Sequence, residues 1–268
     1  MIGAIIGDIV GSRFEWDNVK TKEFEFFDPD CFFTDDSVMT LAVAQAILKC
    51  GGDLDALERE AVACMRELGK HYPLAGYGGR FTMWLLSKNP KPYNSFGNGS
   101  AMRVSPCGFA AKTLEEAIAM ADAATKVTHN HPEGMKGAEA TAAAIFLARS
   151  GASMQEIRDY IEQNYYKIDF ALDEIRPTYT FDVSCQGSVP QALEAFFEST
   201  GFEDAIRNAI SIGGDSDTIA AITGGIAEAY YGVPEEILDR ALTFLDDIQM
   251  EILIAFREKY PGVPCSSN

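Results

Sequence analysis

The spacing of apolar residues constrains this chain more than any other feature. In most segments they recur at steps of three and four, as Leu114, Ile118 and Ala121 do. This spacing places them on one face of an α-helix. The best strand candidate is one short stretch, residues 179–183, whereas residues 20–27 alternate only weakly and end as a loop. We therefore expect an all-α fold of roughly ten helices, packed as a single compact orthogonal bundle.

The composition fits one globular domain spanning residues 1–268, because no linker or low-complexity tract divides the chain. The net charge of −18, with no basic block, argues against nucleic acid and anionic membranes as partners. Residues 1–10 are apolar but lack a leading basic residue and are too short for a signal or membrane segment. We expect a cytoplasmic monomer.

The six cysteines are scattered and form no C-x-x-C pair, so we interpret them as reduced core thiols. With three histidines in the chain, a nitrogen–sulfur metal site is not expected. The cysteines are Cys31, Cys50, Cys64, Cys107, Cys185 and Cys265.

The first predicted helix carries glycines at steps of four, Gly3, Gly7 and Gly11, which indicates close packing against another helix. Packing does not explain Asp8 in the same apolar segment. A buried carboxylate needs hydrogen-bond donors or a cation.

Acidic residues open two of the predicted helices. Residues 34–36, Thr-Asp-Asp, precede one apolar helix, and residues 213–218, Gly-Gly-Asp-Ser-Asp-Thr, precede another. Helix capping is the simpler interpretation of each, yet a cap uses one residue and not two acids. The second motif lacks the lysine of a phosphate loop. If the two clusters converge, four carboxylates need cations, and oxygen ligands suit Mg²⁺ or Mn²⁺ in a two-metal centre.

A third motif, residues 97–103, is rich in small residues. Such a segment exposes backbone N–H groups that can bind phosphate oxygens, although an ordinary turn is the alternative.

Together these motifs resemble the ADP-ribosylglycohydrolases, a family that includes dinitrogenase reductase-activating glycohydrolase and the eukaryotic ADP-ribosyl hydrolases. The resemblance spans nearly the whole chain and keeps the order of the family's motifs. They are residues 7–11, 34–37, 97–103, 128–129 and 213–218.

The resemblance implies a Mg²⁺-dependent hydrolase, with Mn²⁺ as the alternative ion, that releases ADP-ribose from a modified protein or small molecule. It implies metal ligands at Thr34, Asp35, Asp36, Asp215, Asp217 and Thr218. It also implies catalytic roles for Asp36 and for Glu15, which matches a glutamate of the serine-directed branch and is otherwise a solvated loop acid. It implies ligand contacts at Gly97, Asn98, Gly99, Ser100, Met102, His129 and Ser188.

Two other functions stay open at this point: a two-metal phosphoester hydrolase and a catalytically silent relative. The group that carries the ADP-ribose also stays open, with arginine, serine and O-acetyl linkages as alternatives. Residues 72–81, rich in glycine and tyrosine, form either a tight helix connection or a mobile loop that touches the substrate.

Overall fold

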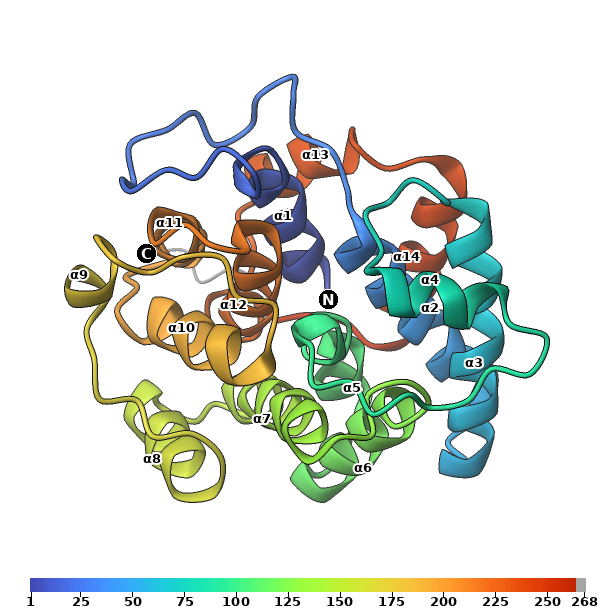
Figure 1. Cartoon of the computed structure of the whole chain (residues 1–268). Coiled ribbons are helices and arrows are strands. Elements are labelled where there is room, and N and C mark those ends of the chain that lie inside the picture. The colour runs from blue at the N-terminus through green and yellow to red at the C-terminus, as the bar shows by residue number, and fades with distance from the viewer. Residues whose placement is uncertain (264–268) are drawn as a thin grey trace.

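Helices make up all the regular structure of residues 1–263, the part of the chain that this computed structural model describes (Figure 1). The all-α prediction is confirmed. The expected number of about ten helices was too low, because the structure has fourteen α-helices and four of them have eight residues or fewer, too few to repeat an apolar stripe. The α-helices are α1 (Ile2–Gly11), α2 (Asp35–Cys50), α3 (Leu54–His71), α4 (Gly79–Leu86), α5 (Ser105–Ala110), α6 (Leu114–Thr125), α7 (Pro132–Arg149), α8 (Met154–Asn164), α9 (Leu172–Ile175), α10 (Cys185–Phe197), α11 (Phe202–Ser211), α12 (Ser216–Tyr231), α13 (Glu235–Leu242) and α14 (Asp247–Lys259).

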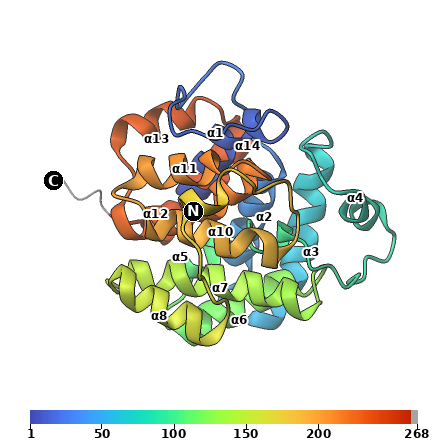
Figure 2. The same cartoon turned by 60° about the vertical axis from the view of Figure 1, so that its left-hand side comes forward.

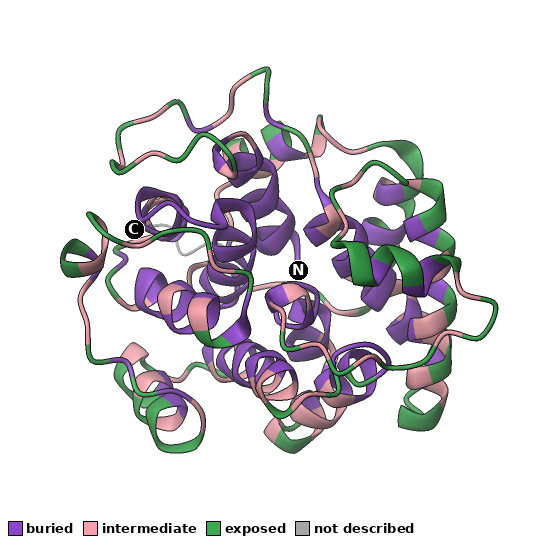
Figure 3. Ribbon diagram, in the orientation of Figure 1, coloured by how far each residue is buried: buried purple, intermediate pink, exposed green. Residues whose placement is uncertain are grey.

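The centre of the molecule is the pair α1 and α12. Every residue of α1 is buried, and α12 is buried along nearly its whole length (Figure 3). A Cβ atom on Gly7 would lie 2.0 Å from the carbonyl oxygen of Ala220, and one on Gly3 would lie 2.2 Å from that of Gly224. The glycine stripe therefore brings the two backbones into contact, as predicted. This contact also fixes the acidic residues of the two helices relative to each other.

The other helices surround this pair. Figures 1 and 2 both show α6, α7 and α8 below it, with α3 and α4 to the right. Two short 3-10 helices, η1 (Ser12–Phe14) and η2 (Asn98–Ser100), stand in the connections nearest the site described below. No helix within residues 1–263 is long and apolar enough to cross a membrane.

The predicted strand at residues 179–183 is wrong. This stretch is irregular, and the bridge beside it joins just one pair of residues, Gly97 and Ser184. Its aromatic residues serve other contacts: Tyr179 donates a hydrogen bond to the Gly187 carbonyl (2.6 Å), and Phe181 stacks on Trp16. The alternation therefore marks neither a strand nor a buried face, since Phe181 and Val183 are exposed.

Five cysteines are buried and free, in agreement with the prediction of reduced thiols, and Cys265 lies outside the described residues.

Candidate metal centre and ligand cavity

A cavity of about 450 Å³ contains most of the residues that the sequence analysis selected. The starts of α2, α4 and α12 border it, together with the glycine-rich segment around η2. A second cavity, of about 490 Å³, lies beside α13 and α14 and contains none of the predicted site residues. The smaller cavity is therefore the candidate site.

The start of α2 is held in place by Asp8. Thr34 is the N-cap of α2 and accepts a hydrogen bond from the Asp36 N–H (3.3 Å), so the capping interpretation was correct. Asp8 accepts hydrogen bonds from the Thr34 hydroxyl (2.6 Å) and from the backbone N–H groups of Thr34 and Ser37 (2.9 and 3.0 Å). The carboxylate of α1 thus supplies acceptors for the free N–H groups at the start of α2.

The start of α12 depends on two glycines with left-handed backbone angles, Gly213 (φ 70°) and Gly214 (φ 79°). Asn18 stabilises this turn, since its side chain accepts from the Gly214 N–H (2.7 Å) and donates to the Gly214 carbonyl (2.9 Å). The turn directs Asp215 and Asp217 toward α1 and α2.

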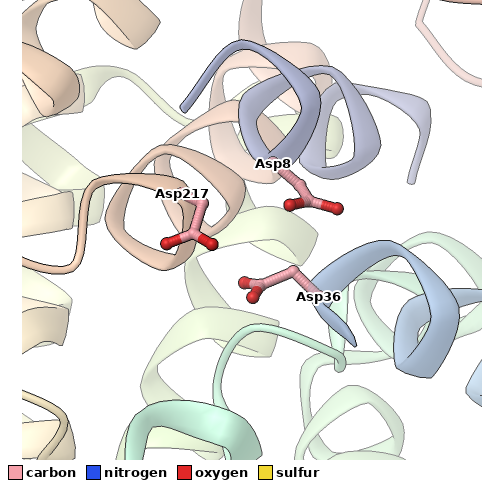
Figure 4. A group of neighbouring side chains, drawn as sticks. All are labelled: Asp8, Asp36 and Asp217. Atoms are coloured by element: carbon pink, nitrogen blue, oxygen red, sulfur yellow. The ribbon is translucent and has the colours of Figure 1, made fainter. Parts of the chain in front are cut away.

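The two acidic clusters converge, as the sequence analysis expected. Asp8, Asp36 and Asp217 form one group (Figure 4). One carboxylate oxygen of each lies within 4.8 Å of the other two, and all three residues are buried. Glu15, Asp215 and Asp217 form a second group of the same size. Asp217 therefore belongs to both. These carboxylates come from three helices and the segment after η1.

The two threonines contact the same carboxylate. The Thr218 hydroxyl donates to Oδ2 of Asp36 at 3.1 Å, and the Thr34 hydroxyl lies 3.4 Å from the same oxygen. Asp35 differs from the other predicted carboxylate ligands, because it lines the cavity but belongs to neither close group. Burial, followed by repulsion from Asp8 and Asp215, raises the pKa of Asp35 to about 8.

The charge of the cluster is uncompensated. Burial and then the neighbouring carboxylates raise the pKa values of Asp36 and Asp217 well above the ordinary range. Oδ1 of Asp36 is buried and has no hydrogen-bond partner in the described part of the chain. Buried carboxylates in this state need protons or cations. The set consists of oxygen donors, which fits hard divalent cations such as Mg²⁺.

Glu15 lies at the open side of the cluster and is half-buried. Burial, followed by repulsion from Asp215, raises its pKa to about 7. A hydrogen bond from the neighbouring Trp16 opposes this shift. Both protonation states of Glu15 are thus populated near neutral pH.

The glycine-rich segment forms the opposite end of the cavity. Gly97, Asn98, Gly99 and Met102 line it, and the Asn98 amide links this segment to the acidic cluster by donating to Asp215 at 2.6 Å. The predicted contacts Ser100 and Ser188 are fully buried and do not line the cavity. The same Asn98 amide donates to Ser188 (3.0 Å), so Ser188 lies behind the cavity wall.

His129 lines the cavity beside the glycines. A Cβ atom on Gly99 would lie 3.4 Å from its Nε2 atom, which therefore faces the segment. The Nδ1 atom is 2.7 Å from the Thr128 hydroxyl, and that hydroxyl accepts from the buried Arg103 guanidinium (2.7 Å). His131 instead caps α7, where its ring accepts from the Glu133 N–H.

Several cavity residues were not selected from the sequence. Asp8 was recognised as unusual but not as a member of the acidic group, and it does not line the cavity. Trp16 and Tyr93 line the cavity and were not selected. Arg80 also lines it and lies in residues 72–81, for which substrate contact was one of two alternatives. Asp8 carried a signal, a charge inside an apolar helix. The other three are ordinary loop or helix-end residues whose positions depend on the tertiary fold.

Comparisons with known proteins agree with this geometry. The family model described as ADP-ribosylglycohydrolase matches residues 1–261. The chain is 28% identical to human ADP-ribosylhydrolase ARH3, over 88% of this chain and 85% of that protein. It is 25% identical to ADP-ribosylarginine hydrolase Tri1 of Serratia proteamaculans, over 90% of this chain and 73% of that protein. A solved structure titled ADP-ribosylglycohydrolase-related protein complex shares the fold, with a TM-score of 0.67 at 23% identity, covering 97% of this chain and 95% of that one.

Proposed function

The chain belongs to the ADP-ribosylglycohydrolase family, and we propose that it is a Mg²⁺-dependent hydrolase that cleaves the glycosidic bond at C1″ of an ADP-ribosyl group. The observation that carries this proposal is the buried acidic cluster at one end of a cavity whose other end is the glycine-rich segment. The ribose of an ADP-ribosyl group would bind at the acidic cluster, and the diphosphate beyond the ribose would bind at the glycine-rich segment.

The metal ligands in this proposal are two carboxylates and one hydroxyl from each cluster. Divalent cations bound there would hold the ribose hydroxyls and supply Lewis-acid activation of water. The shared position of Asp217 supports two ions rather than one. We assign Asp8 a positioning role, because hydrogen bonds from Thr34 and Ser37 already occupy its oxygens. The ligands are Thr34, Asp35, Asp36, Asp215, Asp217 and Thr218.

Glu15 transfers the proton in this account. Glycosidic bonds break through an oxocarbenium-like transition state, in which the leaving atom gains a proton and water loses one. A carboxyl group within reach of the reacting atoms can serve in either role, and burial raises the pKa of Glu15 to about 7 in the metal-free protein. Glu15 is also the least buried carboxylate of the two close groups, as expected of a residue that faces a leaving group projecting toward solvent.

The glycine-rich segment binds the diphosphate in this account, with the Gly99 N–H as its backbone donor, because the N–H groups of Gly97 and Asn98 already donate to Ser95 and to the Val183 carbonyl. Gly97 and Gly99 let a ligand approach the backbone closely, and Nε2 of His129 faces the same place. Asn98 couples this end to the metal end, because its amide contacts Asp215. Correct placement of the diphosphate would therefore support the geometry of the cluster.

The test is a panel of substrates, ADP-ribosyl-arginine and ADP-ribosyl-serine peptides and O-acetyl-ADP-ribose, with released ADP-ribose measured by chromatography. We expect turnover of at least one of them with Mg²⁺ and none with excess EDTA. Turnover that EDTA does not reduce would contradict the metal-dependent mechanism. Phosphate release from simple phosphoesters without ADP-ribose release would favour the alternative two-metal phosphoester hydrolase.

A further inference from the structure

Residues 72–81 border the cavity but have no part in the mechanism above. This segment, hereafter the strap, is attached to the start of α2, since the Ala75 carbonyl accepts from the Asp35 N–H at 2.7 Å. At its beginning the Tyr72 hydroxyl donates to Asp246 (2.8 Å). Its second half forms the first turn of α4, and Gly78, Gly79 and Arg80 line the cavity. The strap thus extends from the metal end toward the glycine-rich segment.

Arg80 ends the strap beside the predicted diphosphate site. Its guanidinium lies over the Tyr93 ring, 4.8 Å from the ring centroid, and donates to the Tyr93 carbonyl. The Tyr93 ring in turn lies 5.9 Å from the His129 ring. Arg80 is close enough to His129 that, after burial and Arg103, its charge also lowers the pKa of that imidazole. Arg80 therefore belongs to the His129 end of the cavity.

Arg80 is the exposed cation of the cavity wall. Among the lining residues, the other guanidinium belongs to Arg103, which is 1% exposed and donates to Thr128 and to the Ala124 carbonyl. Arg80 forms no ion pair with a carboxylate in residues 1–263, and its one hydrogen bond there leaves most of its five N–H donors available. An arginine in this state, stacked on an aromatic ring, is suited to a phosphate group.

We propose that Arg80 binds the diphosphate of the ADP-ribosyl group, opposite the glycine-rich segment, and that the strap thereby joins the two ends of the cavity. This inference rests on the proposed function. It answers an electrostatic problem of that function, because a ligand with two negative charges must enter a cavity whose five lining carboxylates carry more charge than two divalent cations compensate. The first turn of α4 supports it, since the space beside Gly78 and Gly79 is open and their backbone can be approached.

The test compares Arg80→Gln and Arg80→Lys with the wild type by calorimetry in excess Mg²⁺. The ligands are ADP-ribose, ADP and adenosine. Because Arg80→Gln removes a charge-assisted hydrogen bond, we expect it to lower the affinity for ADP-ribose and for ADP about tenfold or more. Arg80→Lys should cause an intermediate loss of affinity. The affinity for adenosine, which has no phosphate, should not change. The control is Arg59→Gln, an exposed arginine on α3 outside the cavity, which removes the same charge and should leave all three affinities unchanged.

Three results would overturn this inference. They are unchanged ADP-ribose affinity in Arg80→Gln, an equal loss for adenosine, and an equal loss in Arg59→Gln. If Arg80→Gln does not fold, Arg80→Lys decides alone, and its affinity for ADP-ribose must then fall while that for adenosine does not. A wild type that binds no ADP-ribose in the presence of Mg²⁺ would contradict the proposed function itself.

Discussion

The two ends of the cavity differ in how their buried polar groups are stabilised. At the glycine-rich end most polar side chains are paired: Asn98 donates to both Asp215 and Ser188, and Arg103 donates to Thr128 beside His129, although Nε of Arg103 has no partner in residues 1–263. At the acidic end, buried carboxylates face one another, and Oδ1 of Asp36 has no partner in residues 1–263. Side-chain hydrogen bonds hold the first end together, whereas the second needs protons or cations.

This difference indicates which end of the cavity binds ligand and which end is reactive. The hydrogen bonds of Asn98 and Arg103 fix the shape of the glycine-rich end, which should therefore bind its ligand without large rearrangement. Carboxylates held together against their repulsion have raised pKa values, and such groups mark functional sites more often than structural ones. The predictions below separate the two ends, beginning with the largest expected effect.

Glu15→Gln should lower kcat by about 10²–10⁴-fold, because it removes the proton-transferring group without removing a proposed metal ligand. Affinity for ADP-ribose should persist, and added Mg²⁺ should not restore the rate. Steady-state kinetics and calorimetry measure the two quantities. Asp17→Asn is the matched control, because this exposed acid lies in the same segment but outside the cavity. A kcat within about twofold of the wild type would show that another group transfers the proton.

Asp217→Asn should weaken Mg²⁺ binding by about tenfold or more, because this carboxylate belongs to both close groups. Raising Mg²⁺ should recover part of the lost activity by mass action, unlike in Glu15→Gln. The activity is measured as a function of Mg²⁺ concentration. Asp239→Asn on α13, an exposed acid far from the cavity, supplies the control. An unchanged Mg²⁺ requirement would exclude Asp217 as a ligand.

Gly99→Val should weaken ADP-ribose and ADP alike, by about tenfold, while leaving Mg²⁺ binding intact. The new side chain would start 3.4 Å from Nε2 of His129 and occupy the space of the diphosphate. Gly201→Val tests the substitution itself, because a Cβ atom there meets nothing within 4 Å. If Gly99→Val weakened Mg²⁺ binding instead, the glycine-rich end and the acidic end would not act independently.

The metal-free protein should lose thermal stability as pH rises. The folded-state pKa values of Glu15 (about 7) and Asp35 (about 8) exceed the ordinary values of 4.5 and 3.8. The folded chain therefore binds more protons than the unfolded chain between pH 4 and 8, and the free energy of unfolding falls across that window. We expect Tm in EDTA to be on the order of 5 °C lower at pH 8 than at pH 5, and excess Mg²⁺ to reduce the difference. A rise in Tm with pH in EDTA would contradict this.

The sequence predicted the all-α fold and both acidic clusters, because apolar spacing and helix-start motifs are local signals. The convergence of the two clusters is not a local signal, and it was expected from the resemblance to the family. The sequence did not predict a position for Arg80, whose role depends on where α4 packs. It also placed Ser188 at the ligand, although the fold buries this residue behind Asn98. The alternation at residues 179–183 was misleading, because Tyr179 and Phe181 make local contacts with Gly187 and Trp16 and the segment has no partner strand.

Mn²⁺ titration followed by electron paramagnetic resonance tests the central claim most directly. The account predicts two Mn²⁺ ions per chain, with the spin coupling of ions about 3.5–4 Å apart. Asp217→Asn should lose the coupled signal, and Asp239→Asn should keep it. A protein that binds no Mn²⁺ at millimolar concentration, or that shows isolated ions at saturation, would contradict the two-metal centre.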